Sequence, residues 1–284
     1  MTRVAITGAA GKTGRIVVRH FLDHGDEVLP IDSAGLAGGY GEFSRELGVG
    51  LVRADLTDYG QTVDILKGVD AIVHLAAIPA PGLFPDSTTF LENTSMNYNV
   101  FAAAQLHHIS PVVWASSETT FGLPFDVPPR YAPIDEDHYP LPTSTYALSK
   151  VVSETMGVHF AEWTGAAYIA LRLSNVHLPQ EYAAVRGYQD DFSLRRWNLW
   201  GYVDARDVGQ ACRKAVNAGL TGAHSFVIAA ADTLMEATNA ELMADQFPGV
   251  ELRGEIGDHT TLLSIDKARR LLGYEPEYSW RNQV

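Results

Sequence analysis

Two polar residues four positions apart could move a proton in this chain. Tyr146 and Lys150 occur in the run YALSK, and on a helix their side chains lie on one face. A neighbouring ammonium group favours the phenolate, so it lowers a tyrosine pKa that is otherwise about 10. Ser116 and Ser117 close the apolar run 111–117 and supply hydroxyl groups that could position a reacting oxygen. Because the Tyr-x-x-x-Lys spacing also occurs by chance, an ordinary amphipathic pair is the alternative.

A glycine-rich segment near the start of the sequence has the spacing of a dinucleotide-binding turn. Residues 3–7 read as a short buried strand, TGAAGKTG follows at 7–14, and a helical pattern comes next. Gly8 permits the tight turn, Gly11 lets the backbone approach a pyrophosphate, and Gly14 allows the helix to pack closely on the strand. The first amides of the helix then present partial positive charge to the phosphates. The spacing is G-x-x-G-x-x-G, and a glycine-rich turn without a ligand is the alternative.

An acidic residue ends the second strand pattern. The run DEVLPID at 26–32 ends in Asp32, at about the distance from the turn where a carboxylate holds the adenosine ribose hydroxyls. A carboxylate at this place repels a 2′-phosphate. The sequence therefore predicts NAD as the cofactor in preference to NADP.

With these motifs in order, the chain resembles the extended short-chain dehydrogenase/reductase superfamily, in the NAD-dependent epimerase/dehydratase group. The resemblance runs over nearly the whole chain. It rests on TGAAGKTG, Asp32, ADLTD (54–58), VHLAA (73–77), NVFAA (99–103), ASSETTFG (115–122), YALSK (146–150), LRLSNV (171–176), YVDARDV (202–208) and SIDKARRLLGYEP. These motifs are specific for the superfamily and not for a substrate.

The resemblance implies a role for each matching residue. It places Ser117, rather than Ser116, against the reacting oxygen and makes Tyr146 the acid/base. Lys150 would lower the tyrosine pKa and hold the nicotinamide ribose. Asp55 and Leu56 would flank the adenine, the backbone at 76–77 would lie along the cofactor, and Asn99 would lie in the helix behind the site. Together with the turn, the predicted cofactor-binding residues are Gly8, Gly11, Lys12, Thr13, Gly14, Asp32, Asp55, Leu56, Leu75, Ala76, Ala77, Asn99, Tyr146 and Lys150.

Composition and charge exclude several classes of function. Of the 284 residues, 46% are hydrophobic, so the chain can bury a substantial core. A net charge of −13 repels nucleic acid and anionic membranes, and we expect neither as a partner. No Cys-rich or carboxylate-rich surroundings accompany the histidines, so we expect no metal. The lone Cys212 and the lack of an N-terminal hydrophobic signal predict a cytoplasmic protein.

Strand and helix patterns alternate along the chain. Strand-like runs occur at 3–7, 27–31, 49–54, 70–75, 111–116 and 167–173, and helical patterns near 11–24, 58–67, 88–108 and 145–163. The alternation predicts an α/β fold, a Rossmann-type doubly wound parallel sheet with a small C-terminal substrate-binding portion. We assign 1–174 to the NAD-binding domain, with 205–230 returning to it. The substrate-binding portion then comprises 175–204 and 231–284.

The segment after Asn175 is short. It has 27 residues before Val203, whereas the nucleotide-sugar epimerases that the chain resembles have a longer insert here. An arginine can grip a carboxylate with two hydrogen bonds, and we favour Arg186 for this role, while Arg195 and Arg196 could equally be solvated. In its short length, the segment is most similar to the corresponding segment of uronate dehydrogenase and related sugar dehydrogenases. The predicted substrate-binding residues are Ser116, Ser117, Asn175 and Arg186.

These observations predict an NAD-dependent oxidoreductase that moves hydride between the carbinol carbon of a sugar or sugar acid and nicotinamide. The alternative is a nucleotide-sugar epimerase or dehydratase that retains its NAD. A dinucleotide-sensing regulatory protein is a third reading, and the intact Ser-Tyr-Lys set counts against it. The resembling families pair the helices predicted at 88–108 and 145–163 across a dimer, so we expect a homodimer.

Overall fold

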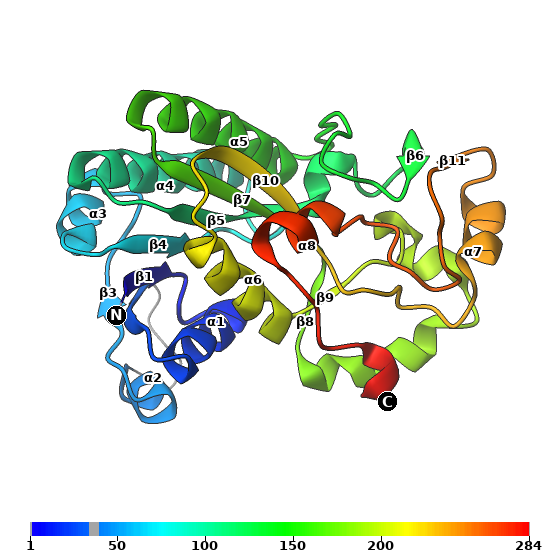
Figure 1. Ribbon diagram of the computed structural model, residues 1–284, viewed down its shortest axis with the longest axis horizontal. Helices are drawn as coiled ribbons and strands as arrows, with labels where there is room; N and C mark the ends of the chain where they lie inside the picture. Colours follow the sequence, from blue (N-terminus) through cyan, green and yellow to red (C-terminus); the bar gives the residue numbers. More distant parts are fainter. Residues whose placement is uncertain (1, 34–39, 284) are drawn as a thin grey trace.

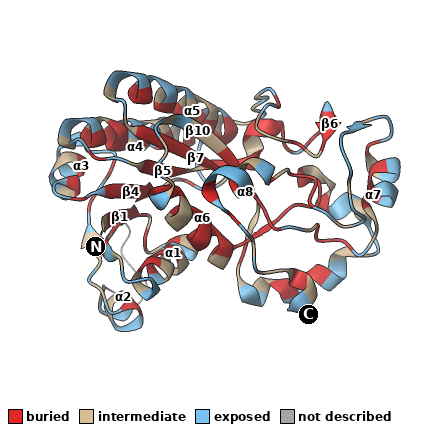
Figure 2. Ribbon diagram, viewed as in Figure 1, coloured by how far each residue is buried: buried red, intermediate tan, exposed pale blue. Residues whose placement is uncertain are grey.

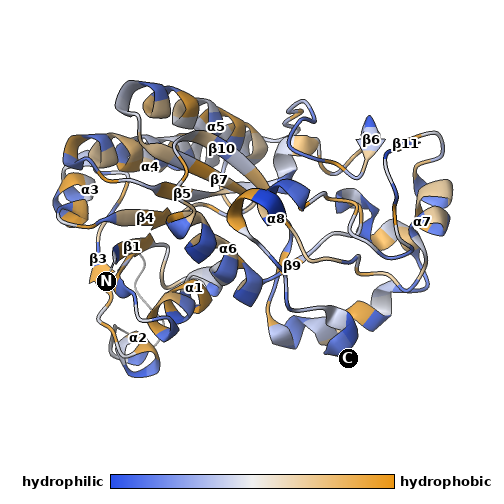
Figure 3. Ribbon diagram, in the orientation of Figure 1, coloured by the Kyte–Doolittle hydropathy of each residue, from blue (hydrophilic) through white to orange (hydrophobic). Residues whose placement is uncertain are grey.

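A parallel sheet of seven strands forms the centre of the molecule. The computed structural model describes residues 2–33 and 40–283. The strands, in the order β10-β7-β5-β4-β1-β2-β3, are β1 (Arg3–Thr7), β2 (Glu27–Asp32), β3 (Val52–Arg53), β4 (Ala71–His74), β5 (Val112–Ser117), β7 (Ala167–Leu173) and β10 (Gly222–Ile228). They are largely buried and apolar (Figures 2 and 3), as expected when helices cover both faces of a sheet. The predicted Rossmann-type α/β fold is confirmed.

Helices cover both faces of this sheet (Figure 1). One face carries α1 (Lys12–Asp23) and α6 (Ala205–Asn217), and the other carries α3 (Tyr59–Leu66), α4 (Asp86–His107) and α5 (Thr145–Thr164). Alternate residues of a strand point to opposite faces, so Val4 and Ile6 join the core beneath α1 and α6, while Ala5 joins the core beneath α4 and α5. A short helix, α2 (Tyr40–Leu47), packs on α1. Within the described ranges, no helix is long and apolar enough to cross a membrane.

Helix α5 has well-defined ends, which fix where its inward-facing residues lie. The Oγ atom of Ser144 accepts a hydrogen bond from the Ala147 amide at 3.1 Å, which caps the first turn. Gly165 ends the helix with a left-handed φ of 71°, a conformation that costs glycine little. Both signals are local in the sequence.

A smaller portion made of short elements lies beside the ends of β5, β7 and β10 (Figure 1). It contains η1 (Glu118–Phe121), β6 (Tyr131–Ala132), β8 (Val176–His177), η2 (Pro179–Tyr188), η3 (Phe192–Asn198), β9 (Val203–Asp204), α7 (Asn239–Gln246), β11 (Glu251–Leu252) and η4 (Trp280–Asn282). Two parallel strand pairs, β8 with β9 and β6 with β11, hold its segments together. Helix α8 (Asp266–Leu272) returns to pack against β10 and α6.

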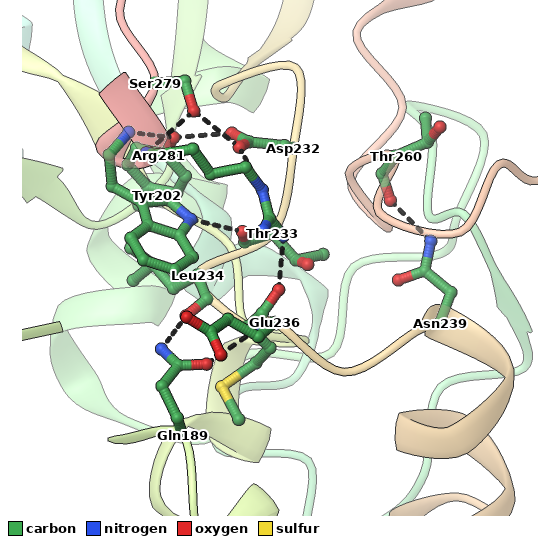
Figure 4. A network of polar contacts seen from close by, with 12 residues as sticks. Gln189, Tyr202, Asp232, Thr233, Leu234, Glu236, Asn239, Thr260, Ser279 and Arg281 are labelled. Atoms are coloured by element: carbon green, nitrogen blue, oxygen red, sulfur yellow. Dashed lines mark hydrogen bonds and ion pairs between the residues drawn. The ribbon is translucent and has the colours of Figure 1, made fainter. Parts of the chain in front are cut away.

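The C-terminal segment is tied to this portion by a polar network (Figure 4). Asp232 accepts hydrogen bonds from Ser279 Oγ at 2.7 Å, Arg281 Nε at 3.2 Å and the Tyr202 hydroxyl at 2.5 Å. The Trp280 indole donates to the Thr233 carbonyl at 2.8 Å. The Trp280 amide also donates to the Tyr202 hydroxyl, 78 positions away, at 3.1 Å, so the last residues of the chain help to shape the portion around η2.

The close approach of α5 to the sheet gives a first prediction. A Cβ atom on Gly157 would lie 2.6 Å from Cη2 of the buried Trp114. We expect Gly157→Ala to lower the free energy of unfolding by about 1–3 kcal/mol, because overpacking forces the indole or the helix to move. Urea unfolding measures the change. Gly187→Ala is the matched control, because a Cβ there would meet no atom within 4 Å; an equal loss in both variants would contradict the explanation.

Candidate functional site

The glycine turn between β1 and α1 leaves no room for side chains. A Cβ on Gly14 would lie 2.0 Å from the Gly8 carbonyl oxygen, and one on Gly8 would lie 2.7 Å from the Ala76 amide nitrogen. Helix α1 begins after Gly11, and no described side chain caps it. The first amides of α1, at 12–14, are therefore open to an anion. A bare backbone cradle beside an uncapped helix start fits the pyrophosphate of a dinucleotide.

Asp32, Asp55 and Asn99 are three further predicted cofactor residues. Asp32, at the end of β2, accepts a hydrogen bond from the Ala10 amide at 2.9 Å. Asn99 on α4 donates to the carbonyl oxygens of Leu56 and Thr57 at 2.9 and 3.0 Å. The exposed Asp55 accepts from the Thr57 amide at 2.9 Å. The structure thus brings Asp32 to the turn, and Asn99 holds the loop that carries Asp55 and Leu56.

Leu75, Ala76 and Ala77 follow β4 and run past the turn. The Ala76 amide donates to Thr7 Oγ1 at 3.2 Å, and the Leu75 amide donates to the Thr7 carbonyl at 3.2 Å. Lys12 behaves differently from the other predicted cofactor residues, because its ammonium group pairs with Glu181 at 2.6 Å and donates to the Val176 carbonyl at 2.9 Å. Its side chain therefore links α1 to the segment β8–η2.

Ser117, Tyr146 and Lys150 come together at the carboxyl end of β5. All three are buried. The Tyr146 hydroxyl is hydrogen-bonded to Ser117, whose Oγ also accepts from the Thr119 amide at 3.1 Å. The Lys150 ammonium donates to the Ala115 carbonyl at 2.8 Å and lies 5.5 Å from the centre of the Tyr146 ring. The i, i+4 spacing on α5 places both side chains toward the strand end, as predicted.

The acidity of Tyr146 differs from the prediction. Burial raises the Tyr146 pKa to about 12, although the hydrogen bond with Ser117 opposes the rise. Burial also lowers the Lys150 pKa to about 8. The predicted lowering of the tyrosine pKa is therefore not seen in the chain by itself, because desolvation of the phenolate dominates and Ser117 is the group that opposes it. In this state the phenol is protonated and able to donate.

Ser116 faces the opposite side of β5 from Ser117. Its Oγ donates to Glu154 Oε1 at 2.5 Å, and Glu154 pairs with the buried Arg172 at 2.7 Å. Consecutive residues of a strand point to opposite faces, so both serines cannot meet one ligand. The structure does not bring Ser116 to the other predicted substrate residues.

A buried carboxyl group next to Ser117 is not among the residues predicted from the sequence. Glu118 accepts hydrogen bonds from Ser174 Oγ at 2.6 Å and Asn198 Nδ2 at 3.1 Å. Burial raises its pKa to about 7; these hydrogen bonds and the charge of Arg195 oppose the rise. The motif ASSETTFG contains Glu118, but its burial depends on partners 56 and 80 positions away.

Arg195 is buried against Asn175. One guanidinium nitrogen donates to Asn175 Oδ1 at 3.1 Å and to the Gly201 carbonyl at 3.2 Å, and the group stacks over the Trp197 ring at 4.8 Å. Three buried polar atoms in this neighbourhood have no partner among the described residues: Arg195 Nε, Asn198 Oδ1 and His177 Nδ1. Buried polar atoms normally have hydrogen-bond partners, so these are positions where ligand hydroxyls or water can bind.

Arg186 lies elsewhere. It is exposed on η2 and lines a cavity of about 520 Å³ with Gln189, Glu236, Trp280 and Arg281, near the network of Figure 4. None of the described walls of this cavity is Ser117, Tyr146 or Lys150. The structure therefore does not bring Arg186 to the relay formed by Ser117, Tyr146 and Lys150. Arg195, for which a solvated position was the alternative, is buried beside Asn175. Within the same ranges, no group of three His, Cys, Asp or Glu side chains is placed to hold a metal ion.

Comparison with known proteins identifies relatives of this chain. The model of the NAD dependent epimerase/dehydratase family matches residues 4–229. The L-arabinose 1-dehydrogenase (NAD(P)(+)) of Haloferax volcanii is 31% identical, with 78% of this chain and 84% of that protein aligned. A UDP-glucose 4-epimerase of Lacticaseibacillus casei is 26% identical, with 97% of this chain and 92% of that protein aligned. A solved structure of a mutated uronate dehydrogenase has a TM-score of 0.71 at 22% identity, covering 100% of this chain and 85% of that one.

The raised pKa of Glu118 predicts a pH-dependent stability. The pKa of this carboxyl group rises from 4.5 to about 7 on folding, so its protonated form stabilises the folded state at low pH. This contribution to the free energy of unfolding is lost as the pH rises through 7. We expect Glu118→Gln to gain stability relative to the wild type between pH 5 and pH 8.5, by on the order of 2 kcal/mol. Urea unfolding at the two pH values measures this. Ser174→Ala keeps the carboxyl group and should follow the wild type; parallel pH profiles for all three proteins would contradict the prediction.

Proposed function

Because the chain belongs to the NAD-dependent epimerase/dehydratase family, we propose that it is a dehydrogenase that oxidises a carbinol carbon of a sugar or sugar acid. It is an enzyme of the extended short-chain dehydrogenase/reductase type, and its cofactor is NAD. The observation that carries the proposal is the meeting of Ser117, Tyr146 and Lys150 at the strand end beside the glycine turn.

In this proposal each residue of the relay has one task. When bound, NAD⁺ supplies the acceptor for the hydride, with its two electrons, that leaves the carbinol carbon. Ser117 would donate a hydrogen bond to the substrate oxygen, and Tyr146, after losing its own proton to solvent, would accept the hydroxyl proton as a phenolate. Lys150, which its hydrogen bond to the Ala115 carbonyl holds at the strand end, would stabilise the phenolate. The carbinol becomes a carbonyl and the proton leaves to solvent.

The cofactor residues are assigned by the same reasoning. The amides of the turn at 8–14 hold the pyrophosphate, and Asp32 holds the ribose hydroxyls of the adenosine. The loop that carries Asp55 and Leu56 flanks the adenine, and the backbone of residues 75–77 lies along the rest of the cofactor. A carboxylate at Asp32 favours NAD over NADP because it repels a 2′-phosphate.

A polyhydroxylated substrate suits the polar atoms beside the relay. The unpaired Arg195 Nε is a donor and Asn198 Oδ1 is an acceptor; His177 Nδ1 is also an acceptor, because Nε2 of the neutral ring donates to Asn175 Oδ1. A sugar presents adjacent hydroxyls that can satisfy both kinds of group. The similarity to the L-arabinose 1-dehydrogenase of Haloferax volcanii supports this substrate class.

Epimerisation of a nucleotide sugar is the second candidate. UDP-glucose 4-epimerases align over nearly the whole chain, at 26% identity in the Lacticaseibacillus casei protein. The same relay would then oxidise and re-reduce a bound sugar while the cofactor stays in place. The short segment between Asn175 and Val203 favours the dehydrogenase, because it leaves less chain to enclose a nucleotide diphosphate.

We also propose a homodimer formed through α4 and α5. Their outer surface carries exposed apolar side chains, among them Leu148, Val158 and Trp163. A shallow cavity of about 380 Å³ between Tyr98, Met156 and Trp163 adds to it. A contiguous exposed apolar patch is typical of a protein interface.

Within the protomer we propose a division into an NAD-binding domain (1–174 with 205–230) and a substrate-binding portion (175–204 and 231–284). We also propose that the enzyme lies in the cytoplasm, where NAD is supplied.

Net NADH formation tests the dehydrogenase proposal. The purified protein with added NAD⁺ and free aldoses or uronic acids should accumulate NADH continuously. The initial rate of NADH formation is measured by absorbance. Tyr146→Phe removes the proton-transfer group and keeps the ring, so we expect turnover to fall roughly 10²–10⁴-fold.

Cofactor binding is the control for this variant. NADH titration by fluorescence should give Tyr146→Phe an affinity close to that of the wild type. Turnover of Tyr146→Phe within about twofold of the wild type would refute the acid/base assignment. A wild type that ignores free sugars, retains NAD through purification and interconverts UDP-hexoses is an epimerase.

Sedimentation velocity tests the dimer. Trp163 is 65% exposed on α5, and Trp163→Arg places a charge in the proposed interface. We expect this variant to sediment as a monomer at concentrations where the wild type is a dimer. Val127→Arg is the control, since Val127 is 75% exposed on a loop outside α4 and α5. A monomeric wild type, or equal behaviour of the two variants, would rule out this interface.

A further inference from the structure

Glu118 occupies a special place beside the relay. It follows Ser117 directly at the start of η1, it is almost completely buried, and its charge contributes to the raised pKa of Tyr146. Ser174 and Asn198 orient its two oxygens from the loop after β7 and from η3. The carboxyl group is therefore fixed between the relay and the proposed substrate-binding portion.

Arg195 is the cation near this carboxyl group: it donates to the Gly201 carbonyl at 3.2 Å, and Asn198, which donates to Glu118, also donates to that carbonyl at 2.8 Å. Burial lowers the Arg195 pKa, and the negative charge of Glu118 opposes this change. Burial raises the Glu118 pKa, and the positive charge of Arg195 opposes that change. Glu118 is the one carboxylate, among the described residues, that stabilises the Arg195 charge in this way. The two groups together carry no net charge when both are ionised.

The other arginines of 175–204 are occupied or distant. Arg186 is exposed at the separate cavity near η4. Arg196 donates to the Phe125 carbonyl at 3.4 Å and lies over the Phe247 ring at 4.9 Å. Next to the relay, the buried Arg172 already pairs with Glu154 at 2.7 Å. A substrate carboxylate that approaches Ser117 would therefore meet a compensated arginine and a fixed negative charge.

We propose that Glu118 sets the charge class of the substrate, so that the enzyme oxidises neutral aldoses in preference to sugar acids. This inference rests on the dehydrogenase function proposed above. Glu118 balances the charge of Arg195, which leaves Arg195 Nε as a donor to a hydroxyl group rather than as the anchor of an ion pair. An acidic sugar is disfavoured because its carboxylate is repelled by Glu118 without gaining an unpaired cation.

Two series of ring-matched sugars test the proposal in the wild type. D-Galactose, L-arabinose and D-galacturonate share one ring configuration and differ in the group on C5: a hydroxymethyl, a hydrogen or a carboxylate. D-Glucose, D-xylose and D-glucuronate form the second series. With NAD⁺ at pH 8.5, where Glu118 is ionised, we expect kcat/KM for a neutral sugar to exceed that for its acid by roughly tenfold or more.

Glu118→Gln removes the charge and keeps the shape. Arg195 then lacks its counter-charge, so we expect the ratio of kcat/KM for neutral sugar to that for acid to fall by roughly tenfold. A residue that only supports the fold would lower both constants together and leave the ratio unchanged. Ser174→Ala is the control, because it removes a hydrogen bond to Glu118 but retains the charge, and it should keep the wild-type ratio.

The outcomes separate this inference from the function on which it rests. A wild type that prefers the uronates, or a Glu118→Gln ratio equal to that of the wild type, overturns the role of Glu118 and leaves the dehydrogenase intact. If Glu118→Gln does not fold, the wild-type ratio decides. A protein that binds NADH but reduces NAD⁺ with none of the six sugars overturns both proposals.

Discussion

Burial of ionisable groups at the carboxyl end of β5 is the constraint on which the site depends. Lys150, Glu118 and Arg172 are each almost inaccessible to water. Removing a charge from water is unfavourable unless a partner or a change of protonation compensates it. Arg172 obtains Glu154, Glu118 obtains two donors and the charge of Arg195, and Lys150 obtains the Ala115 carbonyl. Each functional side chain is thereby held in one orientation before a ligand arrives.

The parts that could be predicted from the sequence are those with a local signal. Apolar runs of strand length gave the central strands, and the glycine turn, Ser117, Tyr146 and Lys150 were placed by short motifs that the parallel sheet brings to one edge. The strand β10 was not identified, because GAHSFVI alternates little and its outer half is partly exposed. The helix α7 has eight residues and a weak apolar pattern, and it was likewise not identified.

The parts that could not be predicted depend on contacts between distant positions. Residues 179–198 form two 3-10 helices, η2 and η3, whose side chains follow no helical or strand period. Nothing in this segment distinguishes the exposed Arg186 from the buried Arg195. The pKa of Tyr146 also depends on distant parts of the chain. The spacing on α5 predicts that Lys150 is near, but it does not predict how far the surrounding chain excludes water from the phenol.

Helix α5 connects the relay with the proposed interface. Tyr146 and Lys150 point from it toward the strand end, while Leu148 and Trp163 lie on its outer surface. Gly157 lets the helix touch Trp114, so its distance from the sheet is fixed by a contact without a side chain on the helix side. A second protomer packed on the outer surface would restrict the same helix from the other side. Dimerisation would then stabilise the orientation of the tyrosine and lysine, although the partner contributes no atom to the relay.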